Sequence, residues 1–336
     1  MAVVLKRLAL LVVMLFGLLT ITFTISHVAP GDPAALAAGP DATLEMRQRI
    51  REEFGFNKPL PIQFGIYLAG VARGDLGRSV QTNQSVTVDL LRYFPATLEL
   101  VSAAMLIAVA LAIPLGMLSA MLRNTWFDHV ARIVSVSGVA VPMFWLGLML
   151  QLFIALHLGW LPLGGRLGLM ALPPEPVTHL YLVDSLLRGQ WGTFMDAWAH
   201  ILLPAVALCL PALAAIVRVN RAEMIEALAM DYVVNARAQG ITRGRIVAVY
   251  ALKNAMLPTL AIIGLRYGWM LGGTVLVETV FNWPGIGLYA TQSAVAQDFQ
   301  PIMGVALLIG VNFMLANLLV DLCYGWLDPR TREAGG

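Results

Sequence analysis

Two ionisable side chains, Arg266 and Glu278, interrupt an apolar stretch that runs from Leu257 to Phe281. If a helix starts near Pro258, Arg266 lies about 12 Å along it. Charges at such depth in a membrane usually face a bundle interior or a watery path. Two interpretations stay open for Arg266: a transient partner for a carboxylate on that path, or a structural ion pair or hydrogen bonds to carbonyl groups. Glu278 lies near the far end of the stretch, where a local cap or pair is its simplest role.

A second candidate site is the basic segment DYVVNARAQGITRGRIVAVYALKNAMLP, residues 231–258, which lies between two apolar runs. Its pattern predicts a helix over 231–239 that ends at Gly240, because glycine tolerates the left-handed conformation. Thr242 suits the N-cap of a second helix. Helical spacing places five residues of that second helix near one face, and Pro258 opens the next apolar run. The five are Ile246, Val249, Tyr250, Lys253 and Leu257.

Three arginines, Arg237, Arg243 and Arg245, lie near the tip of this predicted helix pair. Basic residues in such a place suit a surface of anionic lipid. A short helix pair with a tight glycine corner instead suits insertion into a groove of another protein. The pattern alone leaves both interpretations open.

Several kinds of catalytic and binding site have no motif in this sequence. The chain has no G-x-x-x-x-G-K-[ST] phosphate loop, so it is not expected to bind or hydrolyse ATP itself. It also lacks H-E-x-x-H and G-x-S-x-G, and no Cys/His spacing suits a metal. The two cysteines, Cys209 and Cys323, lie in apolar runs and are expected to be small buried residues. The sequence therefore predicts no metal, no resident cofactor and no enzyme.

The composition is that of a membrane protein. Of the 336 residues, 59% are hydrophobic and only 12% are charged, and the mean hydropathy is +0.76. Soluble domains usually carry about 25% charged residues. The net charge of +2 is too small to indicate nucleic-acid binding. An all-α polytopic membrane protein is therefore predicted.

Six apolar segments are long enough to span a bilayer, which needs about 20 residues. The third contains one span and a loop, and its helix is predicted to stop at GWLPLGG. Pro114, Pro142, Pro204 and Pro211 do not exclude these spans, because a helix bundle can satisfy backbone groups freed by proline. The six segments are residues 8–28, 100–122, 133–165, 197–217, 257–281 and 299–320.

The distribution of Lys and Arg predicts that both termini are cytoplasmic. The loop 218–257 has six basic and three acidic residues, whereas the turn 282–300 has no Lys or Arg. An uncleaved first span is predicted, because secretory signals have shorter apolar regions; cleavage at AALAA, residues 34–38, is the alternative. The predicted organisation is a cytoplasmic N-terminus (1–7), a first transmembrane helix (8–28), an extracytoplasmic segment (29–97), a transmembrane domain (98–323) with the cytoplasmic loop 218–257, and a cytoplasmic tail (324–336).

The extracytoplasmic segment has the pattern of a folded cap. Short helices are predicted over 43–54, with Gly55 as its stop, over 62–71, and over 86–94, ended by Pro95. The segment could contact a partner, or it could be an interfacial collar that lies on the membrane surface without one.

The basic segment resembles the coupling loop of permease subunits of ATP-binding-cassette importers, in the version of the peptide and nickel branch. Departures are Gln239 and Lys253, where the branch usually has lysine and arginine, and Val234-Asn235-Ala236 in place of a Glu-Ala-Ala consensus. The residues that match are Asp231, Tyr232, Ala236, Arg237, Ala238, Gly240, Ala251, Leu252, Asn254, Ala255, Leu257 and Pro258.

Five further motifs extend the resemblance along nearly the whole chain and are similar to the first of the branch's two permease types. Dipeptide permeases are the relatives that the sequence resembles most. The motifs are PGDP from Pro30, GDLGRS from Gly74, FPATLEL from Phe94, FNWPGIG from Phe281 and DPR from Asp328.

The resemblance implies a six-helix type I importer domain in the bacterial inner membrane, in contact with membrane lipid. It implies a second homologous permease subunit, two cytoplasmic ATPase subunits that bind the ATP, and an extracytoplasmic solute-binding protein. The cargo would be a dipeptide, a longer peptide, a glutathione-like compound or another small solute. The coupling residues would be the matches above with Arg243 and Arg245, and the candidate pathway or gate residues are Arg266, Glu278, Trp283, Pro284 and Gly285.

A secondary, ion-coupled transporter is the alternative from another class. Such transporters often show inverted repeats and paired ionisable groups at mid-membrane. No convincing internal repeat is present in this sequence. The alternative stays open at the level of pattern.

Overall fold

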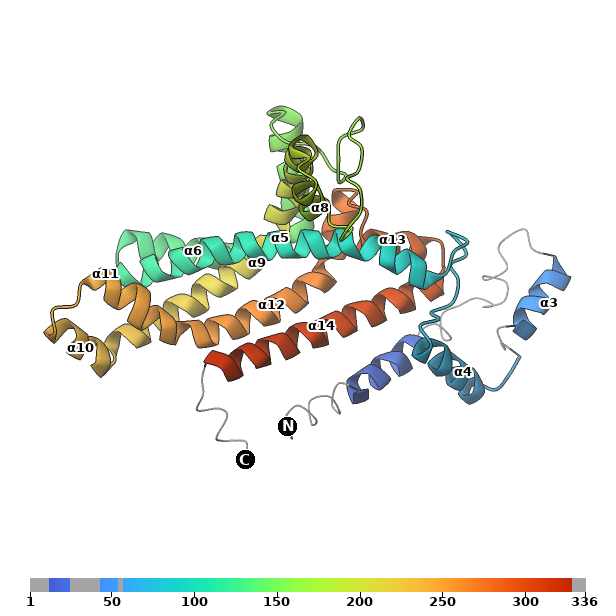
Figure 1. Ribbon diagram of the computed structural model, residues 1–336, viewed down its shortest axis with the longest axis horizontal. Coiled ribbons are helices and arrows are strands. Elements are labelled where there is room, and N and C mark those ends of the chain that lie inside the picture. Colours follow the sequence, from blue (N-terminus) through green and yellow to red (C-terminus); the bar gives the residue numbers. More distant parts are fainter. Residues whose placement is uncertain (1–11, 25–42, 54–56, 328–336) are drawn as a thin grey trace. The chain divides into compact units, whose positions relative to one another are not determined.

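The computed structural model describes residues 12–24, 43–53 and 57–327, and most of these are helical (Figure 1). The only bridge in the described part is an isolated antiparallel one between Arg78 and Ser85. The chain forms two compact units. Unit 1 consists of Met1–Thr97 with Pro284–Met314, and unit 2 of Leu98–Trp283 with Leu315–Gly336.

Unit 1 has a small apolar core where the start of one long helix meets a short one. Val86 and Leu90 pack against Ile286, Tyr289 and Val305. The elements of this unit are the helix Val12–Thr24, α3 (Leu44–Glu53), α4 (Leu60–Ala72), the first part of α5 (Val86–Met121), α13 (Ile286–Val295) and the first part of α14 (Phe299–Leu327).

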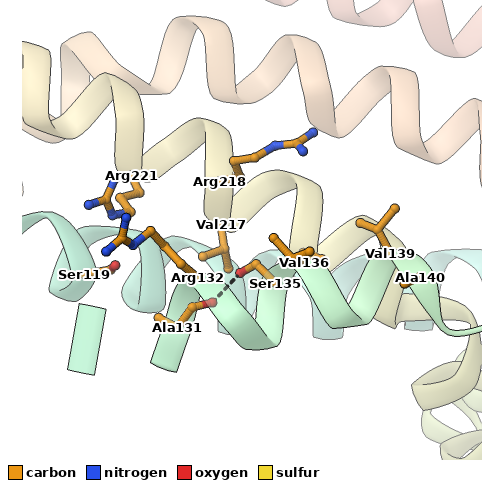
Figure 2. Close-up of a pocket in the computed structure, with 11 residues that line it drawn as sticks. Ser119, Ala131, Arg132, Ser135, Val136, Val139, Ala140, Val217, Arg218 and Arg221 are labelled. Carbon is orange, nitrogen blue, oxygen red and sulfur yellow. Dashed lines mark hydrogen bonds between the residues drawn. The ribbon is translucent and has the colours of Figure 1, made fainter. Parts of the chain in front are cut away.

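Unit 2 is arranged around α9 (Trp191–Ala229), which packs against α6, α7, α8 and α12. Figure 2 shows α6 running along α9. Many buried side chains of α9 are alanines, and small residues let helix backbones approach closely in membranes. The other elements are α6 (Trp126–Ala140), α7 (Met143–Leu150), η1 (Gln151–His157), α8 (Tyr181–Leu187), α10 (Asp231–Ala238), α11 (Arg243–Arg245), η2 (Ile246–Ala251) and α12 (Leu252–Val280).

The described residues contain four helices that are long and apolar enough to cross a membrane, or five if one bent pair is a single span. The bent pair is α6 with Met143–His157, and the bend between these two helices is 102°. Val12–Thr24 is a shorter apolar helix inside the predicted first span. A multi-pass membrane protein is confirmed. The four long helices are Val86–Met121, Trp191–Ala229, Arg243–Val280 and Phe299–Val320.

The prolines behave in two ways. Pro204, Pro211 and Pro258 lie inside helices, so the prediction that Pro258 opens a span is wrong. Pro142 lies at the break of the bent pair, where Val141 is extended at ψ 123°. A residue before proline is pushed out of the helical region. The third predicted span is therefore not one straight helix, although its predicted stop is correct, since η1 ends at His157.

Two of the three short helices predicted in the segment 29–97 are confirmed, as α3 and α4. The third is wrong, because residues 86–94 are the beginning of α5, which continues through Pro95 to Met121. Residues 54–56, including the predicted stop at Gly55, lie outside the described part of the chain.

Candidate functional site

The predicted glycine corner is present between α10 and α11. Gly240 has φ +75°, the left-handed conformation that the sequence predicts. Its N–H donates to the carbonyl of Arg237 (3.0 Å), and the N–H of Ile241 donates to the carbonyl of Ala236 (3.1 Å). This pair of bonds is the Schellman motif, which satisfies carbonyls left free at a helix end. Thr242 holds the N-cap position of α11, but its side chain makes no capping hydrogen bond.

The corner has a small apolar core of its own. Val233, Ala236 and Ile246 are buried, and Tyr232 and Ile241 pack against them. A contact between the residue after the corner and the last turn of the helix often accompanies this motif. The two short helices therefore form one folded unit that is held by side chains as well as by the turn.

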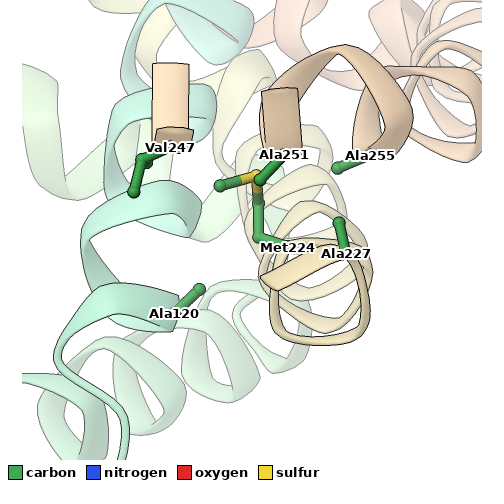
Figure 3. Close-up of a cluster of buried hydrophobic side chains, with 6 residues drawn as sticks. All are labelled: Ala120, Met224, Ala227, Val247, Ala251 and Ala255. Carbon is green, nitrogen blue, oxygen red and sulfur yellow. The ribbon is translucent and has the colours of Figure 1, made fainter. Parts of the chain in front are cut away.

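A second cluster holds this corner to the long helices (Figure 3). Val247 and Ala251 of η2 and Ala255 of α12 pack with Met224 and Ala227 of α9. Ala120, at the end of α5, completes the cluster. Since α9 itself continues to Ala229, residues 218–229 of the predicted loop are the last turns of a long helix.

The five residues predicted to share one face of the second helix do not share one environment, since Ile246 is buried but others are not. Val249 is 54% exposed and Lys253 is exposed, whereas Val247 and Ala251 are buried. The stretch Ile246–Ala251 is π-helical, with bonds from each residue to the fifth before it. The wider turn shifts the buried face away from the one that α-helical spacing indicates.

The side chains at the tip are directed to the outside of unit 2. Arg237, Arg243 and Arg245 are exposed, and among the described residues their only hydrogen bond is a long one of 3.4 Å from Arg243 to the carbonyl of Met121. Eight of the residues predicted for this site lie on the corner, whereas Asn254, Leu257 and Pro258 lie further along α12. The eight are Asp231, Tyr232, Ala236, Arg237, Ala238, Gly240, Arg243 and Arg245.

The second candidate site is at the other end of α12, where the chain turns after Val280. The loop that follows η1 holds this turn: the N–H of Gly165 donates to the carbonyl of Phe281 (2.9 Å). The Gln151 amide donates to the carbonyl of Val280 (3.0 Å). A Cβ on Gly164 would overlap the Phe281 carbonyl, so glycine is required there.

Trp283 and Glu278, two of the predicted gate residues, are buried at this turn. The N–H of Trp283 donates to the carbonyl of Glu278 (2.8 Å), which closes the turn through Asn282 at φ +47°. Pro284 and Gly285 belong to unit 1, where Gly285 is the N-cap of α13. The N–H of Ile286 then donates to Oγ1 of Thr97 (2.9 Å).

A buried ion pair near this turn was not predicted. Arg166 donates to Glu99 through Nη2 (2.6 Å) and Nε (3.2 Å), and the two side chains are only 9% and 5% exposed. The N–H of Leu182 also donates to Glu99 (2.6 Å). The Arg166 guanidinium lies 3.6 Å from the ring centre of Tyr181 and 6.0 Å from that of Trp283. Sixty-seven residues separate the pair along the chain, so no local pattern reveals it.

Arg266 lies within α12 without a hydrogen bond or an ion pair among the described residues, and its Nε is buried. Glu278 is on the same helix, about 18 Å further along, so the two do not pair. The described part of this chain thus provides no structural partner for Arg266.

In unit 1 two buried carboxylates join distant parts of the chain, and one of them, Asp298, holds the end of the GDLGRS motif. Asp298 accepts from Ser79 Oγ (2.7 Å) and from the N–H of Val80 (2.7 Å). Asp89 accepts from Tyr289 Oη (2.8 Å). Burial, and then this bond to Asp89, raise the pKa of Tyr289. Both contacts join residues about 200 positions apart in the sequence, which is why the motif alone does not predict them.

Comparison with known proteins identifies the family of this chain. Residues 112–333 match the family of binding-protein-dependent transport system inner membrane components, and residues 1–101 match the N-terminal family of the same components. The chain belongs to this family. It is the permease subunit of an ATP-binding-cassette importer, as the resemblance implies, and the secondary-transporter alternative is excluded.

The relatives cover nearly the whole chain. A probable D,D-dipeptide transport system permease protein of Escherichia coli is 44% identical over 97% of this chain and 96% of its own length. A dipeptide transport system permease protein of the same species is 40% identical over 98% of both. A glutathione transport system permease protein of Pectobacterium atrosepticum is 34% identical over 97% of both.

Proposed function

We propose that this permease subunit forms, with a second homologous subunit, the pathway by which di- or oligopeptides enter a bacterial cell. The names of the dipeptide relatives support the substrate class, and the glutathione relative keeps a related compound as an alternative cargo. Six spans with both termini cytoplasmic complete the proposal. The chain is non-catalytic and binds no cofactor, and ATP is bound by the partner ATPases.

The corner formed by α10, Gly240 and α11 docks in a groove of a cytoplasmic ATPase. The observation that carries this is the combination of a rigid base and an exposed basic tip. Apolar clusters fix the two helices to α9 and α12, while Arg237 and Arg245 extend outward without a described partner. A movement of the ATPases would therefore be transmitted to the long helices, as alternating access requires.

The outer turn around Trp283 is the second functional element of the proposal. The family is binding-protein-dependent, so a solute-binding protein delivers the cargo from outside. The segment 29–97 is the proposed contact for that protein. Glu278, Trp283, Pro284 and Gly285 form part of the outer gate, and Arg266 is a partner for a peptide carboxylate within the pathway.

The docking proposal is tested by changing the corner in the complete importer, reconstituted with its second permease, ATPases and binding protein. A Cβ on Gly240 would meet nothing within 4 Å, so Gly240→Val acts through backbone strain. Forcing a residue into the left-handed region costs roughly 1–2 kcal/mol. If the whole cost opposes docking, the affinity for the ATPase falls about tenfold. Arg237→Glu should lose binding by charge reversal. Both variants are expected to lower co-purification of the ATPases and uptake of a labelled dipeptide.

Two matched variants control this experiment. Gly240→Asn keeps a residue that tolerates the left-handed conformation and should retain most of the activity. Arg188→Glu makes the same charge change at an exposed arginine between α8 and α9, away from the corner. Parental ATPase association and uptake in both Gly240→Val and Arg237→Glu would refute docking at this corner.

A further inference from the structure

A pocket of about 350 Å³ lies between α6 and α9 in unit 2 (Figure 2). The helices are close at both of its ends. A Cβ on Gly138 of α6 would lie 3.3 Å from Cβ of Ala214 of α9, so the backbones nearly touch there. At the other end Arg221 donates two hydrogen bonds to Asp128, of 2.6 and 2.7 Å. The pocket is the space that remains between these two contacts.

The lining of the pocket is apolar along its walls and basic at one end. Figure 2 shows Arg132 and Arg221 at the end near Asp128, and Val139 and Ala140 at the opposite end. A ligand that fits must therefore combine an anionic group with an apolar chain. The apolar wall consists of Ala131, Val136, Val139, Ala140, Ala214 and Val217.

The basic end carries charge that this chain does not balance. Asp128 accepts hydrogen bonds from Ser119 (2.6 Å) and from the backbone of Asn124 (3.0 Å) as well as from Arg221. Arg132 is only loosely paired with the same carboxylate, at 3.9 Å, it also donates to Nδ1 of the neutral His129 ring, and its side chain is 47% exposed. Arg218 is exposed and has no partner among the described residues. Two guanidinium groups, those of Arg221 and Arg132, thus share one carboxylate, and Arg218 adds a further positive charge to the lining of the pocket.

The position of α6 places the basic end at the level of lipid headgroups. Its first residue, Trp126, is 76% exposed, and tryptophan is enriched at membrane–water interfaces. Helical side chains point toward the N-terminus of their helix, so Arg132 is directed back toward that level. Ile133 and Val134, on the same helix, are also exposed, as expected for residues that face acyl chains.

We propose that an anionic phospholipid of the surrounding bilayer occupies this pocket. Its phosphate is held at the basic end by Arg132, while Arg218 adds positive charge to the lining, and the first part of an acyl chain lies along the apolar wall between α6 and α9. Basic pockets between transmembrane helices are a known mode of binding for such headgroups. A free phosphate ion would leave the apolar wall uncovered.

The test is lipid titration of the detergent-purified, delipidated importer complex, followed by native mass spectrometry. Palmitoyl-oleoyl phosphatidylglycerol should bind more tightly than phosphatidylcholine with the same chains. Arg132→Gln and Arg218→Gln should each weaken phosphatidylglycerol binding about fivefold, with little effect on phosphatidylcholine. Arg188→Gln, an exposed arginine away from the pocket, is the control. Ala140→Phe, which fills the apolar end without entering the core, should also reduce lipid binding.

Three outcomes would overturn the proposal. Equal affinity for the two lipids, or no effect of either arginine change, would show that the pocket does not select an anionic headgroup. Competition by glycerol 3-phosphate as strong as that by the lipid would show a site for a free phosphate ester. A disulfide from Val136→Cys to a cysteine on the second permease subunit, formed in high yield in membranes, would show that a protein covers the groove.

Discussion

Arg166 joins several parts of the segment between η1 and α9 to α5, since it contacts Glu99, the carbonyl of His179 and the ring of Tyr181. Removing one member of a buried ion pair leaves an uncompensated charge, which costs roughly 3–5 kcal/mol. Arg166→Met should therefore lower the melting temperature of the purified subunit markedly. Thermal unfolding in detergent, monitored by tryptophan fluorescence, measures this melting temperature.

The pair of Arg188 and Glu175 provides the control, because its partners are 45% and 74% exposed and lie 3.5 Å apart. Exposed pairs contribute about 0–1 kcal/mol, so Arg188→Met should change the melting temperature little. A double variant, Glu99→Gln with Arg166→Met, should recover part of the loss. Equal effects of Arg166→Met and Arg188→Met would mean that the buried pair is not structural.

At this scale the sequence predicts residues whose role is set by local geometry, and it misses those set by distant contacts. Gly240 is predictable because a left-handed corner between two polar helices requires glycine. The pairing of Glu99 with Arg166 is not predictable, because each is an ordinary charged residue in its own segment. The single face predicted after Arg245 is only partly right, for a different reason: the π-helical turn there changes the period on which the prediction rests.

At the scale of elements, the close approach of α12 and α14 in unit 2 depends on one glycine. A Cβ on Gly264 would overlap Cγ2 of Val320. Gly264→Ala should therefore separate the two helices and destabilise the subunit, by about 1–3 kcal/mol for an overpacked contact. Adding Val320→Ala removes the clashing methyl groups and should restore stability. The melting temperatures of the two variants in detergent measure both effects.

The control for that contact is Gly272→Ala on the same helix, where a Cβ would meet nothing within 4 Å. Alanine is the better helix former, so this change should be neutral or slightly stabilising. If Gly264→Ala is as harmless as Gly272→Ala, or if Val320→Ala gives no rescue, the helices are not packed through this glycine.

The prolines show that the course of a helix at a proline cannot be predicted from the sequence of its own segment. Pro204 and Pro211 are kept in a continuous α9 because α6, α7, α8 and α12 pack around it. Pro142 has the same chemistry, yet its helix bends by 102°. Both halves of the bent pair also pack against α9, so the presence of a proline does not by itself predict whether a helix continues or bends.

At the scale of the whole molecule, the bent pair determines the topology. If Trp126–Ala140 and Met143–His157 together cross the membrane, the loop after His157 is on the side opposite to the start of α6. Then α9 returns the chain to the first side, and the corner at Gly240 meets the cytoplasm. If the pair is a re-entrant loop, α9 crosses in the opposite direction and the corner is outside. The orientation of the proposed docking site therefore depends on this one element.

Cysteine labelling distinguishes these two topologies. In a chain with Cys209→Ala and Cys323→Ala, single cysteines are placed at Gln84, Leu169 and Ala238, which are all exposed. With a crossing pair, a membrane-impermeant maleimide should label positions 84 and 169 in intact spheroplasts, and position 238 only after permeabilisation. The positive-inside distribution of Lys and Arg predicts this result. Labelling of position 238 from outside, with position 169 protected, would instead make the bent pair re-entrant. The corner could then not reach a cytoplasmic ATPase, and the docking proposal would fail with it.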